Sequence, residues 1–232
     1  VPEFTMLEWY RAGEPYDAVI GDCLRILSIA ATEAGTGHLV HERDAERLTV
    51  ADAFARHAGI DLLATLSNGG QSNRDALARQ ATGAGVAFAG DDTWSDIFAR
   101  VLVERIEPKL GHARPTILYE YPRAEAALAR ACARDPRVAE RFELYVCGVA
   151  LANGFGELTA PIEPRKRFEA EMAEKERRYG ERYPIDEELL AALPHMPPSS
   201  GVALGFERLV MLASGAPRIE QVMWTPPAGR AP

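Results

Sequence analysis

The chain has 232 residues, 47% of them hydrophobic and 26% charged, which is enough to form one substantial core. Its formal net charge of −8 argues against a protein that grips nucleic acid mainly through phosphate contacts. The three cysteines, Cys23, Cys132 and Cys147, lie far apart, so they indicate neither a zinc site nor a disulfide framework and favour a reducing, cytoplasmic setting. No apolar run of about 18 residues occurs, so no membrane span is expected.

The first half of the chain is predicted to contain one strand followed by helices. Residues 2–10 alternate weakly between polar and apolar side chains, as a strand does. Apolar residues then recur at helical spacing, interrupted by the Asn- and Gly-rich loop 67–74. The expected helices span residues 16–31, 50–57, 73–82 and 93–107.

The second half mixes strands and helices. β-branched and aromatic residues mark the strands, which are expected at 115–121, 138–146, 149–158 and 201–205. Helices are expected at 123–134, 164–180, 186–193 and 206–213. Because hairpins outnumber βαβ units, we predict an α+β fold, with an antiparallel sheet flanked by helices that lie on one of its faces.

The first predicted strand carries an unusual set of side chains. Alternation places Phe4, Glu8 and Tyr10 on one face, where a ring, an acid and a phenol could hold an adenine and an amine. The alternative is an amphipathic strand with Leu7 and Trp9 in the core. Acids are depleted in strands, which makes the motif stand out.

The predicted strand 138–146 places a carboxylate in the middle of the sheet. Glu143 shares a face with Tyr145, opposite Phe142 and Leu144. A carboxylate in such a position rarely lacks a partner. It is either ion-paired with an arginine or a ligand for Mg²⁺, which prefers oxygen donors.

The next predicted strand has one face of polar and aromatic side chains and one face of only small residues. Asn153, Phe155 and Glu157 share a face, and Ala and Gly residues, Ala150 among them, form the other. An amide, a ring and a carboxylate suit a ligand that carries an ammonium group. The alternative is a glycine-rich edge strand with exposed polar residues.

A small-residue strand near the end of the chain leads directly into a helix. Gly201 and Gly205 would let a flat ligand approach the strand, and Arg208 in the first helical turn could meet phosphate oxygens. Alternatively, Arg208 pairs with a nearby acid and the glycines only allow tight packing.

Taken together, the four segments resemble the lysine-type class II aminoacyl-tRNA synthetases. The stretch Pro2-Glu-Phe-Thr-Met-Leu-Glu-Trp-Tyr10 resembles the second half of their motif 2. Arg141-Phe-Glu143 and Asn153-Gly-Phe-Gly-Glu-Leu158 resemble their ATP/Mg²⁺ and amino-acid strands, and Gly201 to Leu212 resembles motif 3. The resemblance implies a single catalytic domain over residues 1–232, with motif 1 and the first half of motif 2 missing.

The residues of these motifs resemble those of a truncated lysyl-tRNA synthetase paralogue, the elongation factor P–lysine lysyltransferase family. Ala203, where true lysyl-tRNA synthetases usually carry glycine, points the same way. The resemblance implies activation of lysine or (R)-β-lysine with ATP and Mg²⁺, and ligation to a lysine of elongation factor P. It also implies a homodimer built by the missing segment and no tRNA substrate.

The same resemblance assigns roles to individual residues. Catalysis is assigned to Arg208 and Glu143, with Glu143 as the metal ligand. ATP binding is assigned to Phe4, Glu143, Gly205 and Arg208, and amino-acid binding to Glu8, Tyr10, Asn153, Phe155, Glu157 and Ala203. Ala150 departs from the family, because a second metal-binding glutamate is expected there.

Three functional hypotheses follow from the sequence. The first is ligation of lysine or β-lysine to elongation factor P. The second is lysyl-tRNA synthetase activity, against which the acidic charge counts. The third is a non-catalytic relic or sensor, for which Ala150 and the missing motif 2 arginine are the motivation.

Overall fold

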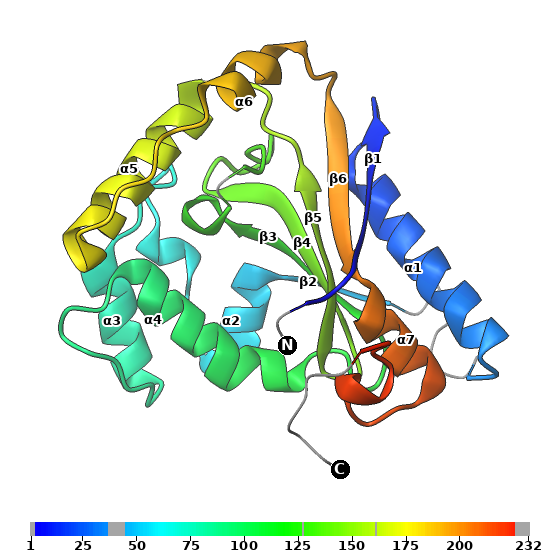
Figure 1. Cartoon of the computed structure of the whole chain (residues 1–232). Coiled ribbons are helices and arrows are strands. Elements are labelled where there is room, and N and C mark those ends of the chain that lie inside the picture. The colour runs from blue at the N-terminus through cyan, green and yellow to red at the C-terminus, as the bar shows by residue number, and fades with distance from the viewer. Residues whose placement is uncertain (1–2, 37–44, 127, 161, 226–232) are drawn as a thin grey trace.

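A mixed sheet of six strands forms the centre of the computed structural model, which describes residues 3–36, 45–126, 128–160 and 162–225 (Figure 1). The strand order is β1-β6-β5-β4-β3-β2. All neighbours are antiparallel except β2 and β3, which run parallel, so the predicted antiparallel sheet is right except at this edge. The strands are β1 (Met6–Ala12), β2 (Glu46–Thr49), β3 (Thr116–Pro122), β4 (Val138–Val146), β5 (Val149–Gly156) and β6 (Ser199–Gly205).

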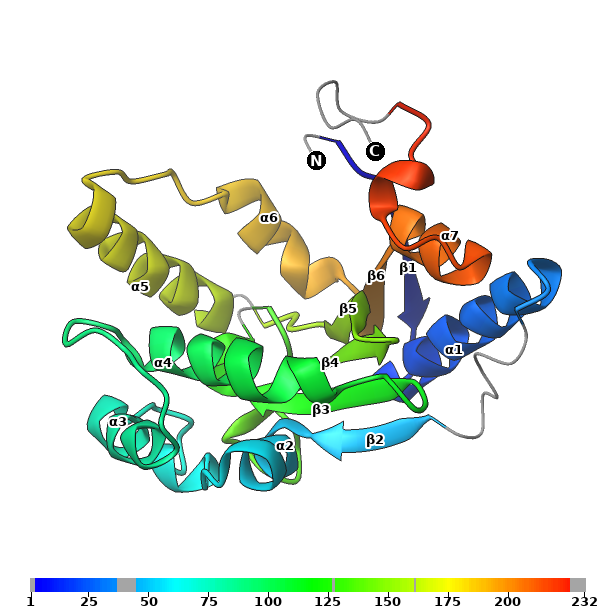
Figure 2. The ribbon, with the colours of Figure 1, turned by 90° about the horizontal axis from the view of Figure 1, so that it is seen from below.

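Helices cover both faces of the sheet, and not one face as the sequence led us to expect (Figure 2). The helices are α1 (Tyr16–Glu33), α2 (Val50–Ala58), α3 (Arg74–Gly83), α4 (Trp94–Val101), α5 (Ile162–Tyr179), α6 (Glu187–Ala192) and α7 (Phe206–Ser214). The reason lies in β3, where consecutive residues are buried on opposite sides. Ile117 packs in the core formed with α1 and α7, whereas Leu118 packs in the core formed with α2, α3 and α4.

One strand is missing from the sequence-based expectations, and one predicted helix is wrong. The four-residue strand β2 has almost no periodic pattern to detect, because it is so short. The alanine-rich helix expected at 123–134 is reduced to a 3₁₀ turn over Arg123–Glu125. Beyond it, Ala129 bridges to Glu157 and Ala131 bridges to Ala139, so pairing with the sheet overrides the helix propensity of alanine.

A register shift between β4 and β5 changes which side chains share a face. Tyr145 pairs with Ala150 and Leu144 with Ala152, so Leu151 is an extra residue between them. Strict alternation had placed Ala150 on the face opposite Asn153. In the structure Ala150 pairs with Tyr145 and Asn153 pairs with Glu143, so both project from the face that carries Glu143, and both line the same cavity.

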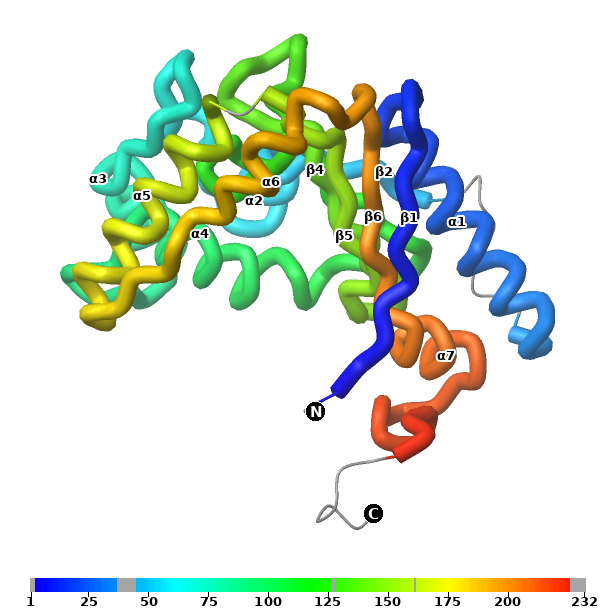
Figure 3. Tube along the Cα trace, turned by 45° about the horizontal axis from the view of Figure 1, so that its top comes forward, coloured from blue at the N-terminus to red at the C-terminus, as the bar shows by residue number. Residues whose placement is uncertain are grey.

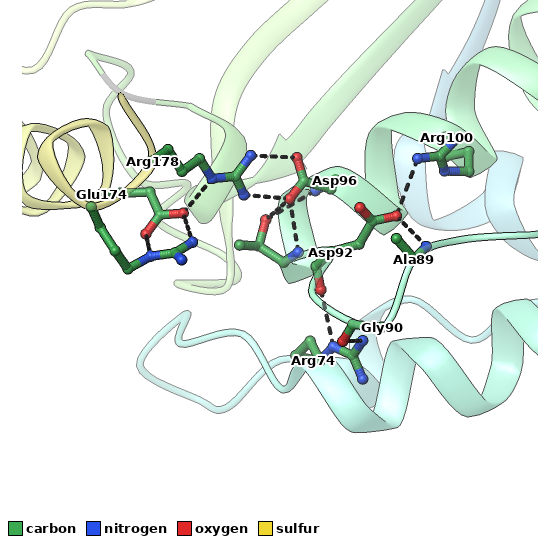
Figure 4. Close-up of polar contacts among 10 residues, drawn as sticks. Arg74, Ala89, Gly90, Asp92, Asp96, Arg100, Glu174 and Arg178 are labelled. Atoms are coloured by element: carbon green, nitrogen blue, oxygen red, sulfur yellow. Dashed lines mark hydrogen bonds and ion pairs between the residues drawn. The ribbon is translucent and has the colours of Figure 1, made fainter. Parts of the chain in front are cut away.

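The arm formed by α5 and α6 connects the end of β5 to the start of β6 (Figures 1 and 3). Pro164 is the one buried residue of α5 among those described, so polar contacts hold this helix in place. At its C-terminal end Arg178 donates to Asp96 at 2.6 Å (Figure 4). Asp96 also completes the capping box of α4 with Thr93, and its hydrogen bonds with Arg178 and Thr93 hold its pKa well below the usual range.

In the described part of the chain, no helix combines the length and the apolar character needed to cross a bilayer.

Candidate functional site

One row of residues crosses four strands on a single face of the sheet. In the observed register Glu8 pairs with Ala203, Ala203 with Asn153, and Asn153 with Glu143. Directly opposed residues of antiparallel strands project from the same face. Four residues that are up to 195 positions apart in the sequence (203 − 8) therefore lie side by side.

The next row brings Tyr10 and Glu157 together above bare backbone. Tyr10 pairs with Gly201, and Gly201 pairs with Phe155. A Cβ placed on Gly201 would lie 2.6 Å from Cε1 of Tyr10 and 2.9 Å from Oε1 of Glu157. The phenol ring and the carboxylate therefore occupy the space that any larger residue would fill.

Two cavities open onto these rows. The first has a volume of about 370 Å³ and is lined by six of the residues predicted for the site, namely Phe4, Glu143, Asn153, Ala203, Gly205 and Arg208. The second, of about 240 Å³, is lined by Asn153 and Phe155 together with Glu125 and Arg141. Because Asn153 lines both cavities, they are neighbours across one side chain.

Glu8 and Tyr10 belong to the same face but are not among the residues that line these cavities. Both side chains are exposed on the edge strand β1, and the exposed fraction of Tyr10 is 63%. Figure 3 shows β1 lying directly beside β6, at the edge of the sheet, so these residues border the site at that edge.

Glu143 is held by two neighbours on its own strand. Nη2 of Arg141 donates to one carboxylate oxygen at 2.6 Å, and the hydroxyl of Tyr145 donates to the other at 2.8 Å. The ion pair with an arginine, which the sequence left as an alternative, is thus present. Alternation of side chains along β4 is the signal that could have identified Arg141 and Tyr145 as site residues.

Arg141 links the two cavities. Its Nε donates to Oδ1 of Asn153 at 3.2 Å, and its Nη1 donates to the backbone carbonyl of Glu125. The guanidinium carbon lies 4.3 Å from the ring centroid of Tyr121, which is buried. Since Oδ1 of Asn153 accepts from Arg141, the amide nitrogen of Asn153 keeps its donors for a ligand.

Arg208 projects over Gly205 toward the larger cavity. Its Cδ would lie 3.3 Å from a Cβ built on Gly205, so a side chain at position 205 would crowd it. Its Nη1 donates to the carbonyl of Ala150. No ion pair joins Arg208 to a carboxylate within the described residues, which argues against the structural ion pair considered from the sequence.

The end of the site near Glu157 favours a positively charged ligand. Burial raises the pKa of Glu157 to about 7, and Arg130 offsets this only in part. The pKa of Tyr10 is also raised, first by partial desolvation and then by the carboxylates of Glu157 and Glu8. Because these carboxylates lie close to the phenol of Tyr10, an ammonium group bound among them would offset their negative charge.

The fit to Mg²⁺ is limited to an ion that arrives with its own oxygen ligands. No group of three or more His, Cys, Asp or Glu residues that could hold a metal occurs in the described residues. Two carboxylates line the larger cavity, and both already accept hydrogen bonds, Glu207 from the backbone N–H of Thr5 and Glu143 from Arg141 and Tyr145. Each oxygen of Glu143 keeps a lone pair, which suits Mg²⁺ carried by nucleotide phosphates and water.

Comparison with known proteins supports the sequence resemblance. Relatives named elongation factor P–(R)-β-lysine ligase are 38% identical over 223 residues in Edwardsiella ictaluri and 39% identical over 224 residues in Sodalis glossinidius. The relative of that name in Vibrio cholerae is 37% identical over 224 residues. These alignments cover 95–96% of this chain but 64% of each relative.

A family model gives the same assignment over nearly the whole sequence. The family described as tRNA synthetases class II (D, K and N) matches residues 1–228. This match includes every strand of the sheet and all of the residues predicted for the site. The chain therefore belongs to the class II tRNA synthetase family that comprises the D, K and N enzymes.

Proposed function

We propose that this chain carries the ATP- and amino-acid-binding centre of a ligase that transfers lysine or (R)-β-lysine to a lysine of elongation factor P. The proposal rests on the row Glu8–Ala203–Asn153–Glu143. This row connects the cavity bordered by Arg208 with an acidic end of the site, where carboxylates would accept the amines of the substrate. The names of the relatives support the amino acid and the acceptor.

The reaction would proceed in two steps. The substrate carboxylate attacks the α-phosphorus of ATP, the bond to the β-phosphate breaks, and pyrophosphate leaves. The acceptor amine then attacks the carbonyl carbon of the adenylate, loses a proton, and releases AMP. Neither step needs a nucleophilic side chain, so positioning and charge stabilisation are the contributions expected of the protein.

The side chains divide between the two substrates. Phe4 would stack on the adenine, Arg208 would neutralise phosphate, and Glu143 would meet nucleotide-borne Mg²⁺. Glu8, Tyr10 and Glu157 would hold the substrate amines, with Asn153, Phe155 and Ala203 shaping the floor beneath them. Gly205 would leave room for the nucleotide beside the strand.

An acceptor assay tests the proposal. The complete gene product would be incubated with ATP, Mg²⁺, elongation factor P, and either lysine or (R)-β-lysine, and the acceptor would then be weighed by mass spectrometry. We expect a mass increase of one lysyl group. If the acceptor stays unmodified and a parallel assay shows charging of lysine tRNA, the lysyl-tRNA synthetase hypothesis is favoured. If calorimetry detects no ATP binding to the protein, the relic or sensor hypothesis is favoured.

Two further features of the proposal stay predictions. Modification of a translation factor would place the protein in the cytoplasm. The homodimer rests on the resemblance to synthetases, and sedimentation of the complete gene product would test it.

The raised pKa of Glu157 predicts a pH dependence of amine binding. An ammonium group is attracted by the ionised carboxylate, and with a pKa of about 7 the ionised fraction falls steeply between pH 8 and pH 6. We expect KM for the amino acid to rise about tenfold over this range. In Glu157→Gln, KM should be high and nearly independent of pH, and a wild-type KM that does not change would contradict the role given to Glu157.

Glu157 should also make stability depend on pH: a higher pH should improve amine binding but lower the stability of the fold. A carboxyl whose pKa is raised by folding stabilises the protein fully below the pKa of the unfolded chain, and this contribution is lost as pH rises through about 7. We therefore expect Glu157→Gln to melt at a higher temperature than the wild type at pH 8. At pH 4 the two proteins should melt at similar temperatures.

A further inference from the structure

Tyr145 is a buried phenol directly behind the carboxylate of the larger cavity. It lies on β4 two residues after Glu143, and its exposed fraction is 2%. Its hydroxyl is 2.8 Å from Oε2 of Glu143 and 3.2 Å from Oε1 of Glu107. No sequence motif of the family resemblance assigned a role to Tyr145 or Glu107.

Glu107 reaches Tyr145 through an irregular turn. After α4 the chain forms a π-helical turn over Leu102–Ile106 and then a 3₁₀ turn over Glu107–Lys109. Ile106 and Leu110 on either side are buried, so they anchor the turn in the core. The turn thus brings a second carboxylate to the phenol from outside the sheet.

The surroundings make the phenol a donor. Both of its hydrogen-bond neighbours are carboxylate oxygens, which only accept, so the hydroxyl hydrogen of Tyr145 must be shared with them. One hydroxyl hydrogen serves two acceptors, while Arg141 engages the other oxygen of Glu143. The carboxylate of Glu143 is therefore fixed at both oxygens.

We propose that Tyr145, anchored by Glu107, is a positioning residue that orients the carboxylate of Glu143 toward a cation carried by the nucleotide. The inference rests on the proposed function, because it requires ATP in the larger cavity. A carboxylate fixed in advance loses less freedom when it meets a hydrated cation. Tyr145 touches neither substrate and acts through Glu143.

The test measures ATP binding as a function of Mg²⁺ concentration by calorimetry, using the complete gene product. In Tyr145→Phe, which removes only the hydroxyl, we expect the Mg²⁺ concentration at half-maximal enhancement of ATP binding to rise about tenfold. ATP binding measured without Mg²⁺ should be unchanged, whereas a collapsed pocket would lose it. The matched control is Tyr119→Phe, since Tyr119 lies on neighbouring β3 and packs with the core on the opposite face.

A double-mutant cycle separates positioning from a general structural effect. If Tyr145 acts through Glu143, Tyr145→Phe should have no further effect on Mg²⁺ dependence in a Glu143→Gln background. An unchanged Mg²⁺ midpoint in the single variant, or additive effects in the cycle, would overturn the inference. If the wild type binds no ATP, the proposed function itself fails, and the two failures are thereby distinguished.

Discussion

Replacement of Arg208 by alanine is expected to lower kcat/KM for ATP by roughly 10²- to 10³-fold, the loss typical of a single group that stabilises transition-state charge. Arg208 follows Gly205, borders the larger cavity, and makes its one hydrogen bond among the described residues to the carbonyl of Ala150. With no carboxylate partner found there, its guanidinium is available to phosphate oxygens.

This substitution should have little effect on the stability of the folded protein. Arg208 is exposed, and a single hydrogen bond contributes about 0.5–1.5 kcal/mol, so the melting temperature should fall by only a few degrees. Arg25→Ala is the matched control, because Arg25 is an exposed arginine of α1, which packs on the other face of the sheet. A large loss of melting temperature in Arg208→Ala, with ATP use retained, would assign Arg208 a structural role.

Replacement of Gly154 by alanine should be among the most damaging single changes in the sheet. A Cβ at this position would lie 2.6 Å from Cε1 of Phe142 and 2.7 Å from the carbonyl oxygen of Gly201. Phe142 is fully buried and Gly201 lies on β6, so neither can move without displacing a strand. We expect the free energy of unfolding to fall by about 3 kcal/mol.

The same change should also damage the site. Gly154 lies between Asn153 and Phe155, so displacing β5 moves both residues relative to β6. Gly21→Ala provides the contrast, because Gly21 is in α1 and a Cβ there would have no atom within 4 Å. That variant should be about 0.8–1 kcal/mol more stable than the wild type, as alanine favours the helix. Equal stability of the two variants in chemical denaturation would show that β5 and β6 are packed differently.

Local alternation was sufficient to predict most of the sheet and much of the site. It placed Phe4, Glu8 and Tyr10 on one face of the first strand, and the observed pairing of Glu8 and Tyr10 with site-face residues of β6 is consistent with that placement. It also placed Glu143 with Tyr145, as observed. Alternation works here because successive side chains of a strand must point to opposite faces, whatever the rest of the fold does.

Alternation failed where tertiary contacts altered the local pattern. The register shift after Leu144 moved Ala150 to the cavity face, which a strict period of two cannot represent. The alanine-rich segment beyond Arg123 paired with β4 and β5 and did not form a helix. In the alanine-rich segment, pairing with neighbouring strands outweighed a helix preference of a few tenths of a kcal/mol per residue, and at Ala150 a bulge inserted one extra residue into the pattern.

The sequence by itself determined the family, the strands that carry the site, and the residue types each strand offers, because these depend on short-range pattern and motif. Only the tertiary structure decided that Glu143 is held between Arg141 and Tyr145, that Glu107 approaches from an irregular turn, and that Asn153 lines both cavities. These contacts depend on strand register and on the packing of α4, and the spacing of residues along one segment specifies neither.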